Sequence, residues 1–81
     1  MRESVKWFAE RMELTLTLHD EKKGSDGWLN DNIYWLYYRL KKEVSELEEV
    51  IYNHDHSSNT KLINECTDVA NFAMMIADCV R

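Results

Sequence analysis

Two pairs of acidic side chains in this sequence have the spacing of one helical turn. Glu43 and Glu46 are three residues apart, and Glu65 and Asp68 repeat that spacing further along the chain. Residues three apart lie on the same side of an α-helix, so each pair presents two carboxylates together. Carboxylate oxygens are the ligands that Mg²⁺ and Mn²⁺ prefer in proteins. The four acids are therefore candidates for a metal site.

The two pairs meet if the helices that carry them are antiparallel across the short connection 53–59. Glu46 and Glu65 are then at nearly the same distance from the connection, and so are Glu43 and Asp68. Four carboxylates at this range repel one another and raise each other's proton affinity unless a divalent cation neutralises them. Magnesium commonly bridges protein carboxylates to substrate phosphates, which points to phosphate chemistry.

The elements that position these acids are predicted to be helices. The chain has 81 residues, only two glycines and no proline, which suits an all-α protein and allows a single domain, residues 1–81. Asn32 is a plausible N-cap, and the turn-rich stretches are 22–32 and 53–59. Apolar residues recur at helical spacing between these breaks. We expect a short antiparallel bundle of three main helices, at about 3–18, 32–52 and 60–80.

The third predicted helix is apolar around most of its circumference. Its one clearly polar strip consists of four residues, Asn64, Thr67, Asn71 and Asp78. Two companion helices cannot cover the rest, and monomers of this size seldom leave a large apolar patch in water. We therefore expect a homo-oligomer, a dimer or a tetramer, that completes the bundle.

Composition excludes several classes of function. Fifteen acidic against ten basic residues give a net charge of -5, which argues against nucleic acid as a partner. No apolar run approaches the length of a membrane span, so no membrane association is expected. Cys66 and Cys79 lie about 20 Å apart on one helix and cannot bridge each other. Two free thiols favour a reducing compartment, the cytoplasm.

The acidic motif resembles the signature of a known family. Glu43-Val44-Ser45-Glu46, eighteen residues and then Glu65-Cys66-Thr67-Asp68 is similar to the E-x-x-E and E-x-x-D pattern of the MazG-like all-α nucleoside triphosphate pyrophosphohydrolases. The resemblance covers roughly residues 8–80, and it implies magnesium-dependent hydrolysis of a nucleoside triphosphate to the monophosphate and pyrophosphate. The four acids would hold the metal, with Glu46 chosen to activate the water. The family's fourth helix is missing here or is supplied by a second subunit.

Candidate substrate contacts are less distinctive. The Asn71 amide either binds a base edge or a sugar, or simply belongs to the polar strip of its helix. Lys22 and Lys23 either reach the phosphates or lie in a solvated loop. Trp28 either stacks on a base or anchors the core.

Other patterns favour structural interpretations. His54-Asp55-His56 lacks the further ligands that a transition metal needs. The aromatic row Tyr34, Trp35, Tyr37 and Tyr38 is assigned to core and oligomer contacts rather than to a stacking platform. The alternative to an enzyme is a non-catalytic helical oligomer that binds nucleotide or a protein partner, or a plain dimeric scaffold with solvated acids.

Overall fold

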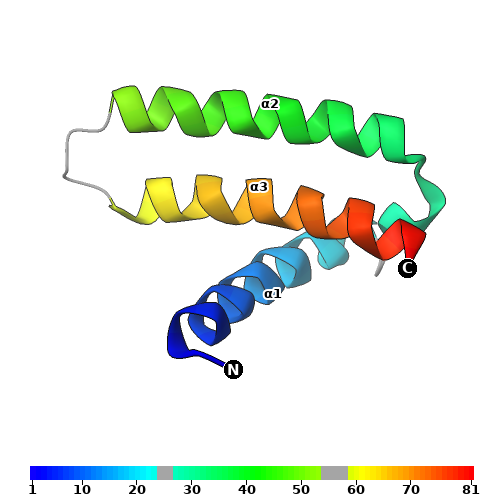
Figure 1. The fold of residues 1–81 in the computed structure, drawn as a ribbon, viewed down its shortest axis with the longest axis horizontal. Coiled ribbons are helices and arrows are strands. Elements are labelled where there is room, and N and C mark those ends of the chain that lie inside the picture. The colour runs from blue at the N-terminus through cyan, green and yellow to red at the C-terminus, as the bar shows by residue number, and fades with distance from the viewer. Residues whose placement is uncertain (24–26, 54–58) are drawn as a thin grey trace.

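The computed structural model describes residues 1–23, 27–53 and 59–81, and these residues form helices throughout (Figure 1). The prediction of an all-α chain is confirmed, since the described residues contain no strand. The elements in chain order are α1 (Glu3–Lys23), the short 3-10 helix η1 (Gly27–Asn30), α2 (Ile33–Tyr52) and α3 (Asn59–Val80).

The ends of the helices follow from local chemistry. Asn32 is the N-cap of α2, as predicted, and its side chain accepts a hydrogen bond of 2.8 Å from the backbone N–H of Trp35. At the other end, the backbone N–H of Asn53 donates to the carbonyl oxygen of Glu49. Helix α1 continues to Lys23, beyond the predicted end at Leu18, because its last turns keep the helical hydrogen-bond pattern.

Helix α3 is the central element of the fold. It runs antiparallel to α2 along its length, and α1 crosses it at an angle on another side (Figure 1). Helix η1 packs against α3 as well. The Trp28 indole N–H donates to Asp78 at 3.0 Å, and the Cys79 thiol donates to the Trp28 carbonyl oxygen at 3.6 Å. These bonds tie the segment before α2 to the C-terminal end of α3.

The middle of the polar strip of α3, at Thr67 and Asn71, is an internal contact surface rather than a solvated face. Thr67 and Asn71 are only 1% and 3% exposed. Thr67 satisfies its hydroxyl by donating to the Ile63 carbonyl oxygen at 2.9 Å, and Asn71 donates from Nδ2 to the Met12 carbonyl oxygen of α1 at 3.4 Å. Helix α1 therefore covers the strip, and small polar side chains suit this close helix contact because they can hydrogen-bond to backbone groups.

The apolar residues that recur at helical spacing along α2 form a stripe that is covered on one side only. Leu36 is fully buried, but four residues spaced along α2 remain between 37% and 56% exposed. We call these four the open stripe: Ile33, Tyr37, Val44 and Ile51. Helix α3 packs beside the stripe and leaves this side free, so the single chain does not bury it. None of the described helices combines the length and apolar character that a bilayer crossing requires.

Candidate functional site

Three of the four predicted metal ligands come together between α2 and α3. Glu43, Glu46 and Glu65 each offer a carboxylate oxygen, and these oxygens lie within 4.8 Å of one another. The antiparallel arrangement of the two helices brings Glu46 close to Glu65, as their nearly equal distances from the connection predict, and Glu43 lies one turn before Glu46. Asp68 lies outside this group of three, which we call the acidic cluster.

Burial differs across the acidic cluster. Glu43 is 7% exposed, although its place on the helical wheel predicts a position at the edge of the apolar stripe. It is buried because α3 packs against that edge. Glu65 is half-buried and Glu46 is exposed. Glu43 is therefore the inner carboxylate of the cluster, and Glu46 is the outer one, open to solvent.

The electrostatics of the cluster favour a bound cation. Burial first, and then the neighbouring carboxyl groups of Glu46 and Asp68, raise the pKa of Glu43 to about 7. The pKa of Glu65 is also raised, mainly by burial and then by the charges of Asp68 and Glu46. Without a cation, these groups relieve their repulsion by binding protons.

Two oxygens of the cluster have nothing to bind within the described part of the chain. Oε2 of Glu43 and Oε2 of Glu65 are buried and have no hydrogen-bond donor there. The nearest cationic group recorded for Glu43 is Arg39, whose Nη2 lies 3.6 Å from Oε1. Buried carboxylate oxygens without donors are unfavourable unless they are paired or bound to a metal. An all-oxygen set of this kind fits a hard cation such as Mg²⁺ or Mn²⁺.

Asp68 connects the acidic cluster to a neighbouring cavity. The pKa of Asp68 is raised overall, chiefly because the carboxyl group is buried. The nearby His19 opposes this shift, and the charge of Glu46 adds to it. The side chains of Asp68 and His19 both line a cavity of about 430 Å³. Asp68 therefore lies between the three clustered acids and the cavity, where it can act on a ligand that occupies both.

The cavity has mostly apolar walls. It lies where the C-terminal half of α1, η1, the start of α2 and the C-terminal half of α3 come together, and its volume is typical of a small-molecule site. Large aromatic and apolar side chains from three of these elements line it: Trp28, Trp35, Phe72 and Met75. A flat ring can stack against such walls.

Asn71 supplies a fixed hydrogen-bond acceptor in this cavity. A carbonyl oxygen only accepts, so the contact with Met12 requires that the Asn71 amide nitrogen faces α1. Its Oδ1 is then left buried, with no partner among residues 1–23, 27–53 and 59–81, while the residue lines the cavity. A ligand that places an N–H or O–H group there would satisfy it.

The remaining predicted contacts divide into two groups. Trp28 lines the cavity, and its indole N–H is already engaged by Asp78, so only its ring is available to a ligand. The side chains of Lys22 and Lys23 lie outside the described residues, as does the His54-Asp55-His56 sequence.

Sequence reasoning missed three residues of the site, Trp35, Arg39 and Phe72. Trp35 and Arg39 precede Glu43 by eight and four residues, so all three lie on the same side of α2. Phe72 follows Asp68 by four residues on α3. The spacing of four residues from Glu43 and from Asp68 could have identified them, because residues four apart on a helix lie on the same face.

Comparisons with known proteins identify no relative of this chain. The chain matches no protein-family model, no curated protein and no solved structure. The function of the site is therefore argued from its geometry and from the acidic motif.

Proposed function

We propose that this protein hydrolyses a nucleoside triphosphate to the monophosphate and pyrophosphate, using Mg²⁺, or Mn²⁺, held by Glu43, Glu46, Glu65 and Asp68. The observation that carries the proposal is the pair of buried, donorless oxygens on Glu43 and Glu65 within a cluster of three converging carboxylates. A divalent cation bound by this cluster would give both carboxylates the positive partner that they lack. The resemblance of the motif to the MazG-like family agrees with this chemistry.

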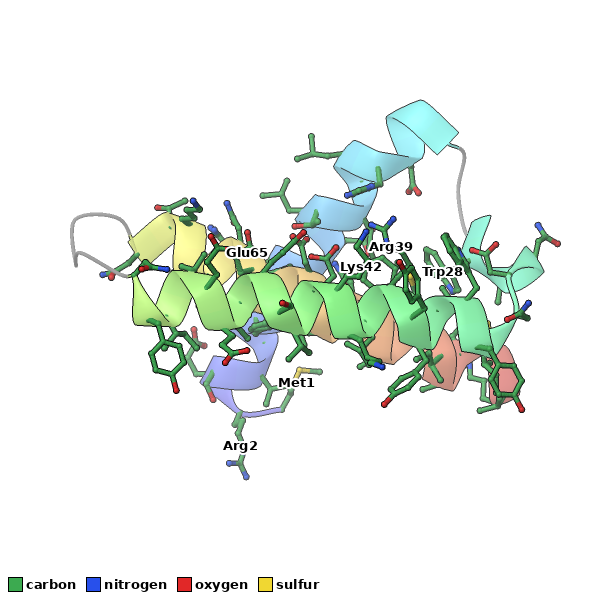
Figure 2. All side chains as sticks on the ribbon, turned by 90° about the horizontal axis from the view of Figure 1, so that it is seen from above. Met1, Arg2, Trp28, Arg39, Lys42 and Glu65 are labelled. Carbon is green, nitrogen blue, oxygen red and sulfur yellow. The ribbon has the colours of Figure 1, made fainter. Side chains whose placement is uncertain are left out.

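The order of groups along the helices matches the order of groups in a nucleotide. On α2, Trp35, Arg39 and Glu43 follow one another at intervals of about 6 Å. On the antiparallel α3, Phe72 lies beside the cavity and Glu65 in the acidic cluster. Figure 2 shows Trp28, Arg39 and Glu65 in this order along one edge of α2. A base bound in the cavity beside Trp28 would therefore direct its phosphates toward the metal ligands.

The chain's own groups divide the work of the reaction. Held by the four acids, magnesium would offset phosphate charge and make a nearby water more acidic. Glu46, the exposed member of the cluster, would take a proton from the attacking water. The water oxygen adds to phosphorus at the α–β anhydride, and the bond to the bridging oxygen breaks to release pyrophosphate. Glu43 and Glu65 hold the metal in place.

The cavity provides base and sugar recognition in this proposal. Trp28, Trp35 and Phe72 offer ring faces for stacking, and Oδ1 of Asn71 accepts a hydrogen bond from a base edge or a sugar hydroxyl. Lys22 and Lys23 are proposed phosphate contacts from the end of α1.

A second copy of the chain is the proposed partner for the open stripe. The stripe repeats at intervals of four and seven residues, which is the pattern of a helix that packs along another helix. A two-fold dimer, or a tetramer built from it, would bury the stripe and supply the helices that a three-helix chain lacks. The free thiols Cys66 and Cys79 agree with a cytoplasmic location.

The test is release of pyrophosphate from a panel of nucleoside triphosphates with magnesium, with manganese and with a chelator. We expect metal-dependent release that is lost in Glu46→Ala and Asp68→Ala, while Glu48→Ala, an exposed acid on the same helix, behaves as wild type. Nucleotide binding without turnover would favour the non-catalytic oligomer. Neither binding nor release from any triphosphate would reject the proposal.

A further inference from the structure

We propose that Arg39 is a phosphate-binding residue, whose guanidinium exchanges the carboxylate of Glu43 for phosphate oxygens when a divalent cation enters the acidic cluster. The proposal rests on the proposed function in that the phosphates belong to the substrate. Its test uses inorganic pyrophosphate, so that it can fail or succeed independently of turnover.

The position of Arg39 is the first argument. Its Cζ lies 5.5 Å from the centre of the Phe72 ring, its Nη2 lies 3.6 Å from Oε1 of Glu43, and its side chain lines the cavity. The guanidinium therefore sits where the cavity meets the acidic cluster. Figure 2 shows it along the same edge of α2 as Glu65 and Trp28, between the two.

The unmet hydrogen-bonding capacity of Arg39 is the second argument. A guanidinium carries five N–H donors, and Nε is buried with no partner in the described segments. The 3.6 Å contact to Glu43 is an ion pair too long for a hydrogen bond. The side chain as a whole is 39% exposed, so part of it is open to a ligand although Nε is buried. Phosphate offers pairs of oxygens that match the guanidinium fork.

The balance of charge is the third argument. Among the described residues that line the cavity, Arg39 is the one lysine or arginine side chain, whereas Asp20, Asp31 and Asp68 are acidic. A polyphosphate that approaches this edge meets repulsion from the acids unless a cation offsets it. A metal ion bound to Glu43 weakens the attraction between that carboxylate and Arg39, which frees the guanidinium for the phosphate.

A purely structural Arg39 makes different predictions. If it serves only as a counter-ion to Glu43 and as a packing partner of Phe72, its replacement changes the affinity for metal and the stability of the fold. It then leaves the affinity for a phosphate anion unchanged at saturating metal. Anion binding at saturating metal is therefore the measurement that separates the two roles.

The experiment is titration calorimetry of the full chain with inorganic pyrophosphate at saturating Mg²⁺. We expect Arg39→Gln to weaken binding by about 10- to 100-fold, as for loss of a charge-assisted bidentate contact. Arg39→Lys, which keeps the charge beside Glu43 but not the fork, should fall between Gln and wild type. Lys41→Gln is the matched control, because Lys41 is exposed on the opposite side of the same helix with its Nζ over the Tyr37 ring, and it should bind as wild type.

Two further readouts keep the outcomes distinct. Mn²⁺ binding without pyrophosphate reports whether each variant keeps its metal site, and thermal melting reports whether it keeps its fold. If Arg39→Gln does not fold, the pyrophosphate affinity of Arg39→Lys shows whether Arg39 binds phosphate. Pyrophosphate affinity equal to wild type in folded Arg39 variants, or no binding by wild type, would overturn the proposal. If wild type binds pyrophosphate through Arg39 but hydrolyses no triphosphate, the proposed function fails and the phosphate site stands.

Discussion

The two faces of the α2 and α3 pair reverse the usual relation between polarity and burial. On the face that carries the candidate site, Glu43 and Asn71 are buried, and each has a polar atom without a partner in the described structure. On the open stripe, Val44 and Ile51 are half exposed. Buried polar groups and contiguous exposed apolar groups are each unfavourable in a finished structure.

The comparison shows that the two faces suit different kinds of partner. The polar face offers carboxylates and a hydrogen-bond acceptor, whereas the open stripe offers an apolar surface. Changes on one face should therefore affect catalysis and metal binding, and changes on the other should affect assembly. Substitutions on each face, and a change of pH, test that separation.

Removing an inner carboxylate should produce the largest effect. Glu43→Gln should reduce magnesium-dependent pyrophosphate release by more than about 100-fold. Replacing a residue that only orients a metal ligand already lowers metal affinity or activity by about 10- to 100-fold. The same variant should melt at a higher temperature than wild type without metal, because a buried, repelled carboxylate is gone. Steady-state kinetics and thermal melting check both. Glu49→Gln, an exposed acid on α2, is the control, and equal turnover in Glu43→Gln and wild type would contradict a metal-ligand role.

A charge on the open stripe should disrupt assembly. Val44→Asp should weaken self-association by about 100-fold or more, because a carboxylate would be buried in an apolar interface. Sedimentation of wild type and variant over a range of concentrations measures it. Ser45→Asp, which places the same charge on the adjacent exposed residue about 100° away around the helix, should associate as wild type. A wild-type chain that is monomeric at all concentrations would remove the second copy as the partner of the stripe.

The stability of the fold should depend on the N–H donor of the buried Asn71 side chain. Asn71→Asp puts a carboxylate oxygen opposite the Met12 carbonyl oxygen and should lower the free energy of unfolding by about 1–3 kcal/mol. Asn64→Asp is the matched control, since Oδ1 of Asn64 accepts from Nη2 of Arg11 and a carboxylate keeps that role. Urea denaturation measures both. Equal stability of the two variants would mean that α1 does not require the Asn71 donor.

The pH dependence of stability should be the smallest effect. The folded pKa of Glu43 is about 7 against an ordinary 4.5, so the folded chain binds this proton more tightly than the unfolded chain. Metal-free protein should therefore lose stability as pH rises from about 5 to 7, because stability falls wherever the folded state binds more protons.

Glu65 and Asp68, whose pKa values are also raised, act in the same direction. Thermal melting at pH 5.5 and pH 8 measures the change. Saturating Mg²⁺ should abolish or reverse it, and Glu43→Gln should flatten it. A metal-free chain that is more stable at the higher pH would show that these acids are not destabilised by burial and repulsion.

Much of the fold follows from local patterns. The absence of proline, the N-cap at Asn32 and the helical recurrence of apolar residues suffice to predict the helices. The meeting of Glu46 and Glu65 follows from their nearly equal distances from the connection, because a short connection between long helices makes them antiparallel. Glu43 joins them because it lies one turn before Glu46 on the same helix. The end of α1 was predicted five residues too early, since Thr15 and Thr17 weaken its apolar pattern without interrupting its hydrogen bonds.

The order of residues is enough to predict which chemical groups are present and how they are spaced along each helix, because helical geometry is local. The packing of the helices is needed to show that α1 covers Asn71 and leaves its Oδ1 without a partner in the described residues, and that Arg39 lies between the cavity and the acidic cluster. Which side chains are buried, and which polar atoms have a hydrogen-bond partner, depend on which helix packs against which face. That choice is a property of the whole chain's packing and is not encoded at any single position.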